Sequence, residues 1–177
     1  MAKVTKEDLI ASGDVGVKMG EVPPFMKDRY TLRCRDAEPT VSKSKGNRMI
    51  VLDCEIVEPQ EKVFGGEKYD LTSLKPRYYL ILEREGGHLL KVVELHERLG
   101  LEPIDDETPD VEVYKGLVFD AILSSREDKP QRKNDEGKYE AIKDSKGKEI
   151  KLGFELVCDI KQILEINNDI ENLPPLV

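Results

Sequence analysis

The 177-residue chain has no tryptophan and only three cysteines, and the shortage of cysteine excludes two kinds of site. Cys34, Cys54 and Cys158 are odd in number and lack the CxxC spacing of a zinc site. Neither a disulfide framework nor a structural zinc site is therefore supported. Each cysteine lies in an apolar, strand-like run, so we expect three buried, reduced thiols.

Catalytic motifs are also missing. The sequence contains no GxSxG, no P-loop and no HExxH motif. The only two histidines, His88 and His96, fall at the start and on the apolar face of one expected helix, where structural roles fit. The carboxylates of residues 101–113 are spread along a loop that prolines interrupt. We expect no enzyme, no metal ion and no cofactor, since an enzyme would need a carboxylate or histidine cluster in a pocket.

Long apolar runs are absent from the sequence as well. None approaches the roughly 20 residues that a membrane-spanning helix needs, and residues 1–6 are not typical of a signal peptide. We therefore expect a cytoplasmic protein without membrane association. A composition of 38% hydrophobic and 36% charged residues predicts one modest core with long polar segments, which suits a single domain with insertions.

What the chain does contain is a set of alternating apolar runs. The clearest is Arg48–Glu58, in which Ile50, Leu52, Cys54 and Ile56 share one face at period two. Further strands are expected at residues 28–36, 76–84, 117–125 and 148–163, with a small hairpin at 64–69 and a helix at 88–99 that ends before Gly100.

This order of three strands, one helix and two strands is that of the OB-fold, a five-stranded Greek-key barrel. The predicted fold class is therefore mainly β: an OB-fold-like barrel with one helix between strands three and four and long loop insertions. The expected divisions are an N-terminal arm at residues 1–26, the OB-fold domain at 27–166 and a polar C-terminal tail at 167–177.

The charge of the chain is uneven, although its net value is −8. Residues 27–48 hold seven basic and three acidic residues, a balance of +4, whereas residues 101–113 hold six acids and no base, a balance of −6. A ligand responds to the local field rather than to the sum over the chain. We expect the acidic segment to lie away from the path of a bound strand, which gives the protein two oppositely charged sides.

The basic residues fall where an OB-fold binds oligonucleotides, on strands two and three and in the first and fourth-to-fifth loops. Those loops are residues 37–47 and 126–147. Lysines and arginines would contact phosphates, and an exposed tyrosine would stack on bases. The candidate DNA-binding residues are Arg33, Arg35, Lys43, Lys45, Arg48, Lys75, Arg77, Tyr79, Arg132, Lys133 and Tyr139.

Each candidate also has a structural alternative. The segment from Lys43 to Arg48 is compatible with a solvated hairpin turn. Cross-strand ion pairs with Asp53 and Glu55 could occupy Arg33 and Arg35. Tyr79 could pack beneath the insertion at residues 59–75. Tyr30 and Tyr78 alternate with apolar residues and are expected in the core.

Four segments also resemble a known family. They are Ser42–Ile50, Val51–Val57, Leu95–Gly100 and Tyr114–Phe119. Over residues 28–165 the chain resembles the OB-fold single-stranded DNA-binding proteins of tailed bacteriophages. The resemblance implies a role in phage DNA replication and recombination, in the host cytoplasm, and an acidic C-terminal tail that recruits replication or recombination proteins. The tail here has only Asp169 and Glu171 as acids and departs from that pattern.

The sequence therefore predicts a non-enzymatic protein that binds single-stranded DNA without strong sequence preference, through a basic groove with aromatic stacking. The alternative is a protein-interaction module, a small β-barrel that uses its acidic segment or tail to bind a replication or host protein. That alternative predicts that no basic groove forms and that Asp53 and Glu55 occupy Arg33 and Arg35.

Overall fold

The computed structural model describes residues 17–105, 107–170 and 173. Within these ranges the protein is mainly β, with one α-helix, α2 (His88–Leu99). The strands are β1 (Val17–Met19), β2 (Lys27–Val41), β3 (Arg48–Glu58), β4 (Glu61–Phe64), β5 (Glu67–Asp70), β6 (Arg77–Ile81), β7 (Val118–Glu127), β8 (Gln131–Lys133), β9 (Tyr139–Ala141), β10 (Phe154–Val157) and β11 (Ile163–Ile166). Four short 3₁₀ turns are η1 (Leu71–Ser73), η2 (Glu85–Gly87), η3 (Val111–Val113) and η4 (Ile160–Gln162).

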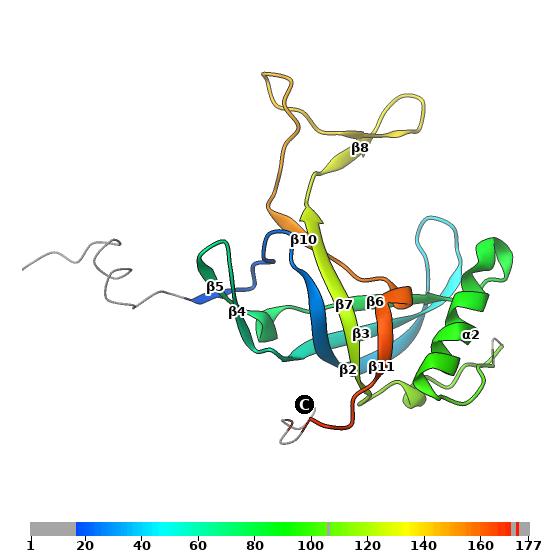
Figure 1. The fold of residues 1–177 in the computed structure, drawn as a ribbon. Helices are drawn as coiled ribbons and strands as arrows, with labels where there is room; N and C mark the ends of the chain where they lie inside the picture. The colour runs from blue at the N-terminus through cyan, green and yellow to red at the C-terminus, as the bar shows by residue number, and fades with distance from the viewer. Residues whose placement is uncertain (1–16, 106, 171–172, 174–177) are drawn as a thin grey trace, which may run out of the picture.

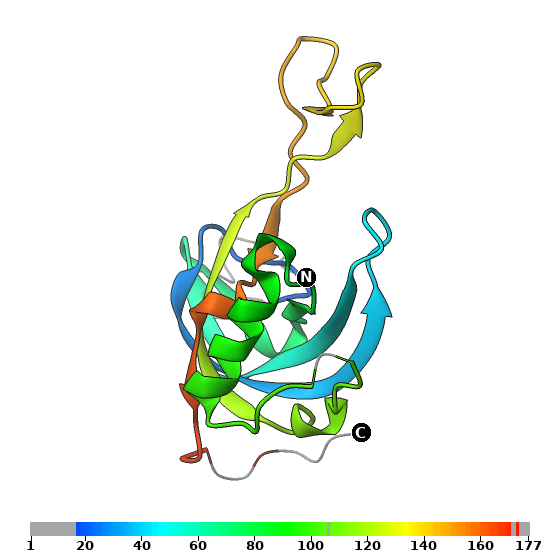
Figure 2. The ribbon, with the colours of Figure 1, turned by 90° about the vertical axis from the view of Figure 1, so that its right-hand side faces the viewer.

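The main sheet has six strands and curls into a half-barrel (Figure 1). Its order is β10-β7-β2-β3-β6, and β11 pairs with β7 beyond the end of β10. All of these pairings are antiparallel. Helix α2 packs against β6, β11 and η4, so it covers one open side of the curl (Figure 2).

The central elements follow the sequence pattern closely. β3 spans the predicted Arg48–Glu58, and its apolar face from Ile50 to Ile56 is buried. Helix α2 has the predicted bounds and buries Leu89, Val92, Leu95 and Leu99. It ends at Gly100, whose φ of 66° is the left-handed conformation that closes a helix without a side-chain clash. Tyr30 and Tyr78 are buried in the core as expected.

The first strand is longer than predicted and is covered on both faces. β2 extends to Val41, and irregular pairing near Thr31 and between Cys34 and Asp36 interrupts its regular register with β3. Residues from Tyr30 to Cys34 are all buried. The candidate residue Arg33 is therefore buried in the middle of this strand and not on an exposed face.

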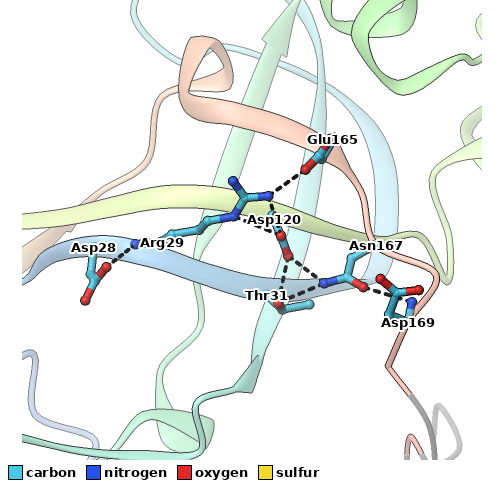
Figure 3. A network of polar contacts seen from close by, with 7 residues as sticks. All are labelled: Asp28, Arg29, Thr31, Asp120, Glu165, Asn167 and Asp169. Atoms are coloured by element: carbon cyan, nitrogen blue, oxygen red, sulfur yellow. Dashed lines mark hydrogen bonds and ion pairs between the residues drawn. The ribbon is translucent and has the colours of Figure 1, made fainter.

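A polar network covers the outer face of β2 near its start (Figure 3). The buried Asp120 carboxylate of β7 accepts hydrogen bonds from the Thr31 hydroxyl at 2.7 Å, the Asn167 amide at 2.9 Å and Arg29 Nη2 at 2.7 Å. Arg29 also pairs with Glu165 of β11 at 2.6 Å. These bonds join β2, β7, β11 and the first residue after β11.

The prediction of one long fifth strand at residues 148–163 is wrong. Only Phe154–Val157 pair with β7 as β10, and the chain then turns through η4 into the separate strand β11. Gly153 has a φ of 104° and breaks the extended run before β10. After it, the Asp159 carboxylate accepts a hydrogen bond from the Lys161 backbone N–H and starts η4.

Residues 128–153, which we call the β8–β9 arm, project from the half-barrel (Figure 1). Reciprocal backbone hydrogen bonds close its base: Leu152 N–H donates to Asp128 C=O, and Asp128 N–H donates to Gly153 C=O. Within the arm, β8 pairs with β9 and Lys143 bridges to Glu149. The loop at residues 42–47, which joins β2 to β3, projects toward the same end of the molecule as the arm (Figure 2).

The insertion at residues 59–75 forms the predicted hairpin. β4 pairs with β5, and β5 also pairs in parallel with β1, which lies outside the main sheet. Tyr69 of β5 is buried rather than exposed in a loop. Residues 1–16 of the expected N-terminal arm lie outside the described residues. No helix within the described ranges is long and apolar enough to cross a bilayer.

Candidate nucleic-acid interface

A groove lies where the two edges of the half-barrel approach each other. It has a volume of about 630 Å³. One wall comes from β6 and the residues just before it, and the other from β10 and the turn into η4. The start of α2 closes one side. The side chains that line it are Lys75, Arg77, Tyr79, Ile81, His88, Lys91, Arg126, Leu156, Val157, Cys158, Asp159 and Ile160.

The lining of the groove is positively charged, although the whole chain is negative. Lysines and arginines contribute four lining residues, whereas Asp159 is the one carboxylate among them. The cations come from the approach to β6, from β6 itself, from α2 and from the end of β7. Because facing walls concentrate the field of like charges, this is an attractive site for an anion.

Two of the groove cations are held by carboxylates outside the lining. Arg77 donates to Asp53 at 2.7 Å, and Arg126 donates to Glu155 at 2.6 Å. The hydrogen bond to Asp53 is the main reason that the pKa of Arg77 rises above its ordinary value. All four side chains are more than 40% exposed, so each pair contributes only about 0–1 kcal/mol and can exchange partners readily.

Tyr79 presents an aromatic ring in this basic setting. It alternates with the buried Tyr78 and Leu80 along β6, and its side chain is exposed, at 47%. Tyr79 is therefore exposed, and it lines the groove beside Arg77. A tyrosine ring with an exposed face can stack on a nucleobase.

Cys158 also lines the groove, whereas Cys34 and Cys54 are buried in the core. Cys34 and Cys54 are directly opposite on β2 and β3, and all three thiols are free. Burial raises the pKa of the Cys158 thiol, which therefore stays protonated near neutral pH. The expectation of reduced cysteines agrees with this arrangement, although Cys158 is only partly buried.

The candidate arginines of β2 lie outside the groove lining. Arg33 is buried, at 6% exposure, and its Nε and Nη2 donate to Glu55 at 2.8 and 2.5 Å. Arg35 is more exposed and lies 3.8 Å from the same carboxylate. The expected exposure of Arg33 is wrong because the strand is covered on both faces, and the alternative pairing with Glu55 is what forms.

The remaining candidates fall into two groups at the end of the molecule where the arm and the loop 42–47 project (Figure 2). Lys43 and Lys45 are exposed in that loop, and Arg48 at its base pairs with Glu83 at 3.4 Å. On the β8–β9 arm, Lys133 pairs in register with Tyr139, and its Nζ lies 5.5 Å from the centre of that ring. Arg132 is exposed beside them.

The acidic segment at residues 101–113 is only partly remote from these groups. None of its described residues lines the groove. However, Glu107 and Pro109 line a smaller cavity of about 280 Å³ together with Thr40, Val41 and Arg48 at the base of the β2–β3 hairpin. The acidic segment is thus separated from the groove, as expected, but it lies next to the basic β2–β3 hairpin.

His96 holds this segment in place and has the expected structural position. It is buried, its Nδ1 donates to the Glu102 carbonyl at 2.6 Å, and its Nε2 is hydrogen-bonded to the Tyr114 hydroxyl at 2.6 Å. His88, by contrast, lines the groove. Within the described residues, no group of three or more His, Cys, Asp or Glu side chains could hold a metal ion.

Sequence reasoning missed three basic residues of the groove lining: His88, Lys91 and Arg126. Both α2 residues lie off the apolar stripe of the helix, which marks them as surface residues but not as groove residues. Arg126 was assigned to a loop, whereas it belongs to the end of β7. The signal that could have suggested it is the paired charge pattern of Arg126 and Glu155 on neighbouring strands.

Comparison with known proteins adds no assignment. The chain matches no protein-family model, no curated protein and no solved structure.

Proposed function

We propose that the protein binds single-stranded nucleic acid, single-stranded DNA in the first place, without strong sequence preference and without catalysis. The observation that carries the proposal is the groove in which an exposed tyrosine lies among four cations of a chain whose net charge is −8. Cations that follow the phosphates and an aromatic ring that stacks on a base are the two parts of a sequence-tolerant single-strand site.

The arrangement of the strands supports an OB-fold-like barrel. Counted without the insertion and the arm, β2, β3, β6, β7 and β10 are the five strands, and α2 lies between the third and fourth. The pairings β2–β3, β3–β6, β2–β7 and β7–β10 are those of a barrel left open between its third and fifth strands. OB-folds bind oligonucleotides on strands two and three and with the first and fourth-to-fifth loops, which here are β3, β6, the loop 42–47 and the β8–β9 arm.

A role in phage DNA replication or recombination, in the host cytoplasm, follows only from the resemblance of four sequence segments and forms part of the proposal. In that setting the protein would coat transient single strands. Replication or recombination proteins would then be its further partners.

One observation favours the second candidate, a protein-interaction module. Glu55 occupies both Arg33 and Arg35, as that candidate predicts. Its other prediction, that no basic groove forms, does not agree with the lining of the groove. We therefore place single-strand binding first.

The test is a fluorescence-polarisation titration with a labelled mixed-sequence single strand of about 30 nucleotides and the matching duplex. Tyr79→Ala removes the stacking ring, so we expect its affinity for the single strand to fall roughly 5- to 150-fold, corresponding to about 1–3 kcal/mol per stacked base. Tyr79→Phe keeps the ring and is expected to bind within about twofold of the unaltered protein.

Two control variants make the result interpretable. Val63→Ala removes another exposed apolar side chain, on β4 and outside the groove lining, and is expected to leave the affinity unchanged. The double variant Lys75→Gln/Lys91→Gln should weaken binding more than Lys68→Gln, whose lysine pairs with Glu61 on the hairpin. If the unaltered protein does not bind the single strand even at low salt, the proposal is wrong and the interaction module becomes the better account.

A further inference from the structure

The backbone conformation around Phe25, and not a loose loop, exposes its side chain. Its side chain is 66% exposed, and its φ is 47°. Among the described residues it is the one non-glycine with a positive φ. A bulky side chain rarely adopts this left-handed conformation, so it persists only where the surroundings impose it.

A single buried serine imposes it here. The Ser125 hydroxyl of β7 donates to the Pro23 carbonyl at 2.6 Å and accepts from the Met26 backbone N–H at 2.8 Å. Met26 itself is fully buried in the core. The backbone is thus fixed on both sides of Phe25, and the tight turn between these anchors points the ring outward.

The ring of Phe25 stands next to a second cavity. Its centre lies 4.9 Å from that of Phe154, and the two planes meet at 76°, an edge-to-face contact that supports the ring. The neighbouring cavity has a volume of about 530 Å³ and contains Glu21 as its one ionisable lining residue besides Tyr69. Its apolar and aromatic lining includes Val22, Pro24, Tyr69, Leu152 and Phe154. Leu152 is 67% exposed at this site.

This cavity lies close to the proposed groove along β10. β10 contributes Phe154 to the cavity and Leu156 to the groove, two residues further along the same strand. On the neighbouring strand β7, Glu127 is the register partner of Phe154, and the groove residue Arg126 is that of Glu155. Both sites therefore adjoin the base of the β8–β9 arm, and Phe154 and Leu156 lie on the same face of β10.

We propose that Phe25 and the cavity beside it form a second base-binding subsite for the same single strand, an inference that rests on the proposed function. The apolar lining with its single carboxylate excludes phosphate from the cavity but suits the flat face of a nucleobase. The phosphates would stay outside, near Arg126. The strained turn holds the Phe25 ring in place before binding, so little ordering is needed when a base stacks on it.

The absence of tryptophan makes this subsite directly measurable. Phe25→Trp and Tyr79→Trp each introduce a single tryptophan, and stacking on a base quenches indole fluorescence. The ligand is oligo-dT of about 30 nucleotides. We expect quenching in both variants, and no quenching in Val63→Trp, a matched exposed position on β4. Phe25→Ala is expected to lower the affinity roughly 5- to 150-fold.

The outcomes separate this inference from the function on which it rests. Quenching of Tyr79→Trp with unchanged fluorescence of Phe25→Trp would overturn the second subsite and leave the groove standing. In that case the exposed ring would instead suit an apolar protein partner. Unchanged fluorescence in both, with no change in polarisation of a labelled strand, would overturn the proposed function and this inference together. Equal quenching of all three variants would also overturn the second subsite, since the signal would then not report a base stacked at Phe25.

Discussion

Asp53 is the residue that competes most directly with a phosphate in the groove. Its carboxylate holds the Arg77 guanidinium at 2.7 Å, and both side chains are exposed. Any anionic ligand that binds Arg77 must displace this contact or share the cation. The same holds for Glu155 and Arg126.

Removing this competitor should therefore strengthen binding. We expect Asp53→Asn to raise the affinity for single-stranded DNA up to about fivefold at low salt, because an exposed pair is worth about 0–1 kcal/mol. The gain should shrink as salt screens the charges. Polarisation titrations at two salt concentrations measure it, with Glu61→Gln on the hairpin as the matched loss of a paired carboxylate. Unchanged or weaker binding of Asp53→Asn would place Arg77 outside the phosphate path.

At the level of single residues, the sequence correctly predicted the exposure of side chains where strand alternation alone determines it. Tyr79 and Arg77 alternate with Tyr78 and Leu80, so their exposed side could be derived from period two. Arg33 obeys the same alternation but is buried, because strand pairs on both sides and Glu55 cover it. His88 and Lys91 could not be placed in the groove, since helix periodicity says which residues are exposed but not what the helix stands beside.

Among the elements, the β8–β9 arm carries the clearest prediction. Its base is closed by the hydrogen bonds between Asp128 and residues 152–153, so residues 130–150 can be replaced by a short Gly-rich turn. We expect the shortened protein to fold, since the side chains of β8 and β9 are largely exposed. If Arg132 and Lys133 both contact phosphates, the slope of log K against log salt should become shallower by roughly 1.4. A salt titration measures that slope, and an unchanged slope would mean that the arm does not contact the strand.

The polar network around Asp120, which binds Asn167 to the sheet, predicts that the stability of the protein depends on pH. Burial alone would raise the pKa of Asp120, but hydrogen bonds from Asn167, Thr31 and Arg29 outweigh it and hold the pKa below the ordinary 3.8. A carboxyl whose pKa is lowered by folding stabilises the protein above its unfolded pKa. This stabilisation is lost as the pH falls through the folded pKa.

Asp120→Asn should therefore lower the free energy of unfolding by roughly 1.5–3 kcal/mol at pH 7, as expected for hydrogen bonds to a charged group. The difference from the unaltered protein should shrink as the pH falls below 3.8. Urea unfolding at pH 7, 5 and 3 measures it. Asp169→Asn serves as the control, since the contact of Asp169 in this network is made through its backbone N–H. A difference that stays constant over this range would show that the charge of Asp120 is not what matters.

Element boundaries show where sequence reasoning stops. β3 and α2 were predicted to the residue because their patterns are long and each ends at a clear signal. The predicted bounds of the fifth strand were wrong because Ile150 and Leu152, which lie in the arm, continue the alternating pattern of β10. What ends the strand is the backbone of Gly153, together with the cap that Asp159 provides to η4. A hydrophobicity pattern contains neither.

For the whole molecule, the distribution of charge matters more than its sum. The groove collects cations from β6, α2 and β7, whereas the described acids of residues 101–113 stay out of its lining. If the four groove cations each contact a phosphate, log K against log salt should have a slope of roughly −3 before any contribution from the arm. Titrations from low to high salt measure it, and a slope near zero would contradict a phosphate-binding groove.

The difference in burial between the tyrosines predicts which of them a chemical label can reach. Tyr30, Tyr69, Tyr78 and Tyr114 are at most 5% exposed, whereas Tyr79 and Tyr139 are 47% and 64% exposed. A nitrating reagent should thus modify two of the six tyrosines in the folded protein, one in the groove and one on the arm. Peptide mapping with and without a bound strand would then show, from one sample, which of the two surfaces the strand shields.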